Sequence, residues 1–183
     1  MPRFVHLFDR PDRFVAGTVG QPGERTFFLQ VRHGTRLLSV ALEKEQVREL
    51  ANRLGELLDH VTAESGVDTQ SQGPADLEPL DSPIEEEFRV GVLALGWNNS
   101  GQHVVIEAHA QTESLADVPD LEEDGEDGPD VLRVRLAAAA ARSFARRALT
   151  VVAAGRPPCP LCEMPLDPRG HICPRANGYL RRG

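Results

Sequence analysis

All three cysteines of the chain, and one of its six histidines, lie between residues 156 and 183. Two of the cysteines form a CxxC pair, and an HxC pair follows after eight further residues. Thiolate and imidazole groups are the ligands that tetrahedral zinc prefers, and two short loops with paired ligands can surround one ion. The spacing therefore predicts a zinc site with four protein ligands, namely Cys159, Cys162, His171 and Cys173.

Four protein ligands would fill the coordination sphere, which favours a structural ion over a catalytic one. Leu166 and Ile172 are expected to pack over the metal. His171 and Cys173 are closer in sequence than is usual, so a site in which water replaces the histidine is one alternative. A reduced cluster of surface thiols and a redox-active CxxC are two others, although the prolines after Cys162 are a poor start for the helix that follows a redox CxxC.

No other part of the sequence predicts a catalytic group. The five remaining histidines are scattered over expected turns, strands and a helix end, where structural roles are the commoner ones: His6, His33, His60, His103 and His109. The chain contains no phosphate-cradling glycine loop, no nucleophile elbow and no pair of acids with catalytic spacing. We therefore assign no catalytic residue, and the sequence favours a non-enzymatic protein without excluding an enzyme.

Charge and hydropathy limit the partners of the chain. Its 183 residues carry a net charge of −8, which argues against extensive nucleic-acid binding. No segment has the length of apolar sequence that spans a membrane, and no signal peptide begins the chain, so we expect a cytoplasmic protein with reduced thiols and no membrane partner. Lys44 is the only lysine, which we attribute to genome composition rather than to function.

The C-terminal segment differs in charge from the rest of the chain. Residues 156–183 hold five arginines and two acids, so that this basic tail carries +3 and residues 1–155 carry −11. A basic tail suits an anionic partner, and nucleic acid is one candidate. The residues that would contact such a partner are Arg169, Arg175, Tyr179, Arg181 and Arg182.

The first part of the chain predicts three strands and a helix. Residues 13–19, 25–32 and 36–42 have strand-like composition or alternation and are separated by turn residues. From residue 43 the apolar period becomes that of a helix, with a stripe of Val47, Leu50, Ala51, Leu54, Leu57, Leu58 and Val61.

The second part repeats this order. Its strand segments lie 74, 77 and 94 residues later, and six positions of the helical stripe map at the offset of 94 onto Ala141, Phe144, Ala145, Ala148, Val151 and Val152. One such unit alone would bury little apolar surface. We therefore expect an α+β fold in which duplicated βββα units form a pseudo-two-fold body of six strands and two helices. Residues 3–8 are available as an additional edge strand, and a small zinc-knuckle tail follows the body.

These patterns divide the chain into four parts. Residues 1–62 form the first unit, 63–86 a linker, 87–155 the second unit, and 156–183 the zinc-binding tail. The linker is rich in Gly, Ser, Gln, Pro and Asp, and we expect it to be flexible. In the second unit, residues 113–130 contain nine acids and no base, which predicts a solvated, disordered loop. A docking loop for a basic partner and weak binding of a divalent cation are the alternatives.

Several longer motifs resemble a known family. They are PDRFVAGTVGQPGERTFFLQ near the start, VLALGW, LRVRL, and AGRPPCPLCEMPLDPRGHICPRANGYLRR at the end. Together they resemble an actinobacterial family catalogued as a domain of unknown function. The resemblance implies gene neighbours that are similar to lipid kinases and histidine phosphatases, and hence a signalling or modification partnership. Glu163 departs from the family pattern, in which glycine is commoner after the second cysteine.

The sequence is thus most consistent with a non-catalytic adaptor or binding protein, which uses a structural zinc site and acts through a protein partner in signalling or regulation. Two alternatives remain: binding of nucleic acid by the basic zinc tail, and an enzyme acting on a phosphate-containing substrate.

Overall fold

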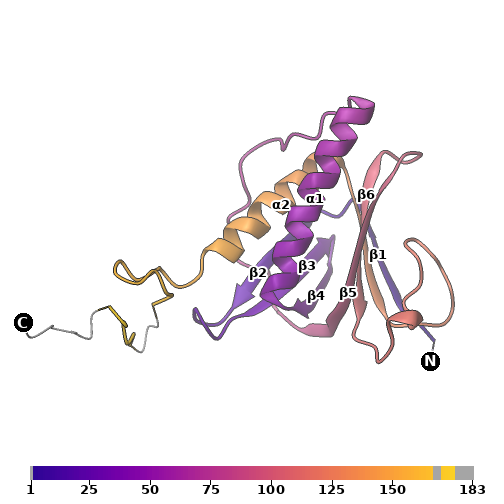
Figure 1. Ribbon diagram of the computed structural model, residues 1–183. Coiled ribbons are helices and arrows are strands. Elements are labelled where there is room, and N and C mark those ends of the chain that lie inside the picture. Colours follow the sequence, from indigo (N-terminus) through magenta and orange to yellow (C-terminus); the bar gives the residue numbers. More distant parts are fainter. Residues whose placement is uncertain (1, 167–169, 176–183) are drawn as a thin grey trace, which may run out of the picture.

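A computed structural model describes residues 2–166 and 170–175 of the chain. Within them, seven strands form one mixed sheet and two α-helices pack on it, so the expected α+β class is confirmed (Figure 1). The elements are β1 (Val5–Asp9), β2 (Arg13–Val19), β3 (Thr26–His33), β4 (Arg36–Leu42), α1 (Lys44–Ser65), β5 (Glu86–Asn98), β6 (His103–Ala110), the short 3-10 turn η1 (Leu115–Asp117), β7 (Val131–Leu136) and α2 (Ala138–Ala153).

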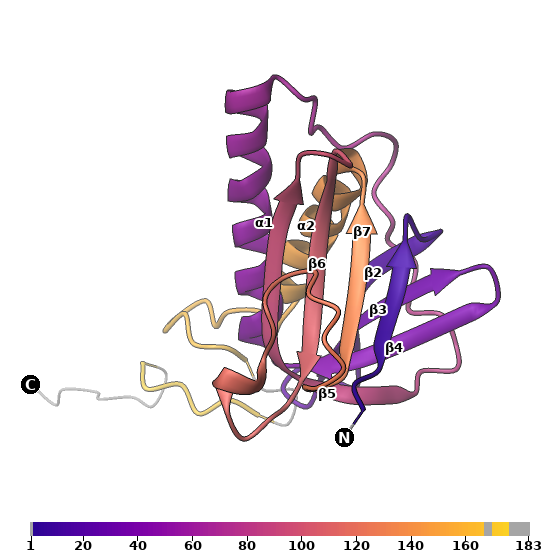
Figure 2. The ribbon, with the colours of Figure 1, turned by 90° about the vertical axis from the view of Figure 1, so that its right-hand side faces the viewer.

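The strand order is β1-β7-β6-β5-β4-β3-β2, in which β1–β7 and β4–β5 are parallel pairs and the others are antiparallel. The two edge strands, β1 and β2, follow each other in the chain and are joined only by residues 10–12. Because the four Cα–Cα steps from Asp9 to Arg13 span about 14 Å at most, the edges must approach each other and the sheet must curl. Figure 2 shows the result: β3 and β4 run at a steep angle to β6 and β7. β5 joins the two parts, since its first residues pair with β4 and its residues from Val90 on pair with β6.

Both helices cover the same face of the curled sheet and pack against each other. α1 lies against β5, while α2 lies against β2 and β6. Along the strands, side chains that point into this layer alternate with side chains that point outward. Ala16, Leu29 and Val40 are examples of the inward-pointing set. The predicted stripe of α1 is buried except for Leu57, which is partly buried, and that of α2 is buried except for Val151. The helices therefore bury the faces that their periodicity indicated.

Local signals fix where α1 begins and ends. The N–H of Glu43 donates to Oε1 of Gln46 at 2.8 Å, as in a capping box. The helix ends at Ser65 and is capped by Gly66, whose φ of 68° is the left-handed conformation that glycine adopts without strain. The N–H of Gly66 donates to the carbonyl of Thr62, which satisfies one of the last carbonyls of the helix. α1 thus starts directly after β4 and places Lys44 at its positive end.

Residues 66–85 form no helix or strand, as expected of a linker, but they are not free of the body. Thr69 and Ser71 contact α2 through Arg142 and Arg146. Residues 76–81 then lie on the outer face of β2 and β3, the face opposite the helices. Asp76 accepts from Arg13 at 2.7 Å, and the buried amide of Gln30 donates to the carbonyl of Asp81 at 2.9 Å. Leu80 lies directly over Gly17, where a Cβ atom would come within 2.5 Å of it. The expectation of a flexible linker is therefore wrong for this segment, because its polar and apolar groups both have partners on the sheet.

The acidic loop, residues 113–130, likewise covers the outer face of β6 and β7. The N–H of Glu122 donates to Oε1 of the fully buried Glu107 at 3.0 Å. Asp124 accepts from Arg133 at 2.5 Å. Most residues of the loop are exposed, as expected of a solvated segment, but the expectation of disorder is corrected, since acids of the loop pair with arginines that β7 presents on this face.

The element order βββα occurs twice, and the bounds of β6 are those of β3 shifted by 77 residues. α2 begins 94 residues after α1. A duplication with a pseudo-two-fold axis stays a prediction, and β1 is the additional edge strand expected beside the six. None of the helices among the described residues is both long and apolar enough to cross a membrane.

Candidate metal centre

The four predicted ligands lie on two short stretches, residues 157–166 and 170–175, that follow α2. Pro158 and Pro165 form an isolated antiparallel bridge, and the N–H of Leu166 donates to the carbonyl of Pro157 at 2.9 Å. Inside this bridge the N–H of Glu163 donates to the carbonyl of Cys159 at 2.9 Å, which closes a tight turn around the CxxC pair. The turn holds both thiols of the pair on the same side of the chain.

The structure brings all four predicted ligand atoms together. Those of Cys159, Cys162, His171 and Cys173 lie within 4.8 Å of one another. The Sγ atoms of Cys159 and Cys173 are 3.8 Å apart. This matches the edge of about 3.8 Å in a tetrahedron with Zn–S bonds of about 2.3 Å, and it is far longer than a disulfide of about 2.0 Å. Nε2 of His171 lies 3.2 Å from Sγ of Cys162, so the histidine belongs to the cluster despite its tight spacing from Cys173. The arrangement can hold one metal ion.

The cluster shields its thiols and favours a thiolate. Cys159 and Cys173 are 4% and 6% exposed. Hydrogen bonds from the N–H groups of Leu161 and Cys162 lower the pKa of the Cys159 thiol to about 6, because they stabilise the charged sulfur. Burial raises the pKa of the Cys162 thiol. Since a metal ligand must be the thiolate, the backbone of the CxxC turn prepares its first cysteine for coordination.

Two residues beside the candidate ligands bear on the expectations from the sequence, namely Glu163 in the CxxC turn and Ile172 in the HxC stretch. Glu163 has a φ of 63°, in the region that glycine adopts most easily, so the departure from the family pattern falls where the backbone favours glycine. Ile172 is 82% exposed and does not pack over the ligands, which corrects that prediction, whereas Leu166 is half-buried. The short segment has too few apolar groups to form a core around the site, so the side chain between two ligands points outward.

The CxxC pair also differs from a redox pair in its setting. Redox CxxC motifs begin a helix, whose positive end activates the first thiol. Here residues 160–162 form a turn and the segment continues without a helix through residue 166. A ligand role is therefore better supported than a redox role.

Of the residues predicted to meet an anionic partner, only Arg175 is among those described. Its Nη1 donates to the carbonyl of Leu161 at 3.0 Å, which ties the HxC stretch to the CxxC turn. The remaining four lie outside the described residues: Arg169, Tyr179, Arg181 and Arg182.

Comparison with known proteins places most of the chain in one family. Residues 6–173, which span nearly the whole body and all four candidate ligands, match the family described as "Protein of unknown function (DUF3090)". The chain belongs to this family. The comparisons found no curated protein and no solved structure that is similar to it.

The structure of this DUF3090 protein also gathers charged residues that the sequence did not single out. Glu107, His109 and Arg133 form a buried cluster on the outer face of the sheet. A pocket between α1, α2 and the β2–β3 turn is lined by four basic residues: Arg25, Lys44, Arg48 and Arg156. The uniqueness of Lys44 in the sequence was the one signal that could have drawn attention to this pocket.

Proposed function

We propose that this protein is a non-catalytic binding protein whose C-terminal segment is fixed by a structural zinc ion and contacts a protein partner. The observation that carries the proposal is the exposure of apolar side chains on the metal-binding segment. Leu161, Met164 and Ile172 are 52%, 53% and 82% exposed.

The chemistry of the ligands supports zinc. Three thiolates and one imidazole form a closed tetrahedral set that suits Zn²⁺, and no position is left for a substrate or an activated water. The close approach of the Sγ atoms of Cys159 and Cys173 agrees with this geometry. A structural ion of this kind orders the loops that hold it and supplies no reaction of its own.

The exposed apolar residues explain what such ordered loops would be for. Leu161 lies inside the CxxC pair and Ile172 lies between His171 and Cys173, so the bond from each ligand to the metal would fix the direction of the neighbouring side chain. Apolar groups held rigidly on a small protrusion lose little entropy on binding, which is the property of interface anchors. A protein surface with a complementary apolar recess is the partner that fits them.

The test compares a double variant, Leu161→Ser with Ile172→Ser, with the wild type in quantitative affinity purification from the native host. The control is Leu115→Ser, which removes an apolar side chain that is 76% exposed on the acidic loop. We expect at least one protein to be enriched by the wild type and by the control but not by the double variant, and to bind purified wild type directly with affinity that the double variant lacks. Equal recovery by all three, or no enriched protein at all, would contradict the adaptor proposal. All variants should keep their zinc.

A further inference from the structure

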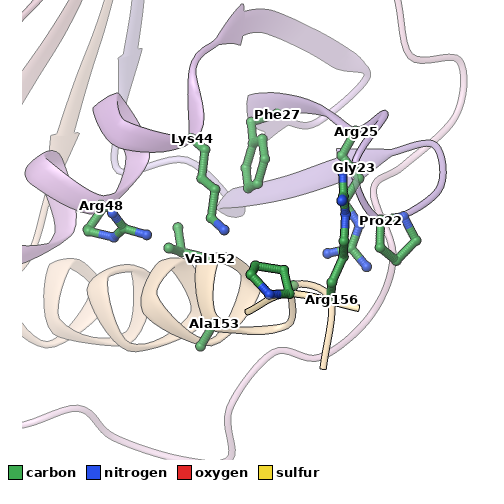
Figure 3. Close-up of a pocket in the computed structure, with 11 residues that line it drawn as sticks. Pro22, Gly23, Arg25, Phe27, Lys44, Arg48, Val152, Ala153 and Arg156 are labelled. Carbon is green, nitrogen blue, oxygen red and sulfur yellow. The ribbon is translucent and has the colours of Figure 1, made fainter. Parts of the chain in front are cut away.

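The turn between β2 and β3, the start of α1 and the end of α2 surround a pocket of about 640 Å³ (Figure 3). Eleven residues line it, and none of them is acidic. Four are cationic, namely Arg25, Lys44, Arg48 and Arg156. The chain has a net charge of −8, so a pocket whose charged side chains are all cationic differs from the protein as a whole and favours an anionic ligand.

Local backbone features bring these side chains to one place. Gly23 has a φ of 94° in the β2–β3 turn, and a Cβ atom there would overlap the guanidinium of Arg156. Lys44 reaches from α1 to the end of α2, where its Nζ lies 3.5 Å from the position that a Cβ of Gly155 would take. Figure 3 shows the Lys44 side chain entering the space between Arg48 on one side and Arg25 with Arg156 on the other.

Structural roles account for only part of this positive charge. Arg48 is paired with Glu45, and Nη1 of Arg25 donates to the carbonyl of Ala154 at the end of α2. A helix C-terminus offsets about half an elementary charge. None of the ion pairs among the described residues involves Lys44, and the Nε of Arg25 is buried without a hydrogen-bond partner. Arg156 has an interaction of its own within the chain. The charge and the donor that the walls of the pocket leave unsatisfied are therefore those of Lys44 and of the Nε of Arg25.

We propose that this pocket binds a small molecule that carries a phosphate group. Arginine and lysine side chains at the positive end of α1 supply the donors that a phosphate needs. Phe27 and Val152, which are 7% and 6% exposed, also line the pocket and provide apolar surface for the organic part of the molecule. The volume lies within the range of about 300–1,000 Å³ that is typical of small-ligand sites. A localised, partly open basic pocket in an acidic body suits such a molecule better than a nucleic-acid strand, which needs an extended basic surface.

The experiment measures binding to the full-length, zinc-loaded protein by isothermal titration calorimetry. The phosphate-bearing probes are pyrophosphate, ADP and glucose 6-phosphate. Adenosine tests whether the charge is required, and a short single-stranded RNA tests the nucleic-acid alternative. The variants are Lys44→Ala with Arg156→Ala, and Lys44→Arg, which keeps the charge. Arg53→Ala is the control, since Arg53 is on α1 but does not line the pocket and its side chain is 67% exposed.

We expect at least one phosphate-bearing probe to bind the wild type, the Arg53→Ala control and the Lys44→Arg variant. The double variant should bind it at least about tenfold more weakly, which corresponds to about 1.4 kcal/mol. Adenosine should not bind. Thermal unfolding of each unliganded variant should match that of the wild type, because Lys44 begins a helix and alanine is a good helix former.

Three outcomes would overturn the proposal: no binding of any phosphate-bearing probe at concentrations of about 1 mM or below, equal binding by the double variant, or binding of RNA alone. The result is independent of the adaptor proposal, because the pocket variants leave Leu161, Ile172 and the four metal ligands unchanged. A protein partner without phosphate binding would support the adaptor proposal and overturn the phosphate site. Phosphate binding without a protein partner would do the opposite.

Discussion

On the outer face of the sheet, the charge of one buried residue, Glu107, is balanced by specific partners. Glu107 is fully buried, and its Oε1 accepts from Nε of Arg133 at 2.5 Å while Oε2 lies 3.0 Å from Nε2 of His109. Burial acts to raise the pKa of Glu107, but hydrogen bonds from His109, Arg133 and the N–H of Glu122 outweigh it and lower the pKa. Glu107 is therefore a buried carboxylate that depends on a buried arginine.

Replacing Arg133 with methionine should lower the free energy of unfolding by about 3–5 kcal/mol, because it leaves the charge of Glu107 buried without its cation. Urea unfolding at neutral pH would measure the loss. The matched control is Arg135→Met, two residues along β7, where Arg135 and Glu122 are 28% and 26% exposed. We expect the control to cost about 1 kcal/mol or less. Equal losses for the two variants would show that Glu107 is not held by Arg133 as the structure indicates.

Individual strands and helices were largely predictable, whereas the segments that cover them were not. β2 and β4 have the bounds that alternation and turn residues indicated, and α1 starts one residue after the predicted change of period. These signals are local, so sequence reveals them. The packing of residues 66–85 and 113–130 depends on contacts with distant strands, such as Asp76 with Arg13 and Asp124 with Arg133. From composition alone, the first of these segments was expected to be flexible and the second disordered.

Packing of the linker can be tested at Gly17 in β2. Alanine there should lower the free energy of unfolding by about 1–3 kcal/mol, because its Cβ would collide with Leu80. In a Leu80→Ala background the same change should cost much less, and a double-mutant cycle followed by urea unfolding measures this coupling.

Gly55→Ala in the middle of α1 provides the control, since the nearest atom to its Cβ would be 4.0 Å away. It should stabilise the protein by about 0.5–1 kcal/mol, as expected for glycine to alanine in a helix. If Gly17→Ala costs the same whether or not Leu80 is present, the linker does not lie against β2 as described.

At the scale of the whole molecule, the body and the metal-binding segment have different sources of order. The apolar core consists of residues from the strands and the two helices and extends no further along the chain than Val152. Beyond it, the described residues are held by the Pro158–Pro165 bridge, a few backbone hydrogen bonds and the cluster of ligands. The sequence predicted from spacing alone that Cys159, Cys162, His171 and Cys173 would lie together, because CxxC and HxC place their side chains locally. It could not predict the basic pocket, which forms only when the β2–β3 turn, α1 and α2 meet.

The most direct test of the account is the metal content of purified protein, determined by elemental analysis and compared with that of a Cys159→Ser, Cys162→Ser double variant. We predict about one zinc ion per wild-type chain and none in the variant. The circular dichroism and urea unfolding of the body should change little, because no residue of the core is altered. Wild-type protein without zinc, or a variant that retains the same zinc content, would contradict the assignment of Cys159, Cys162, His171 and Cys173 as a structural zinc centre.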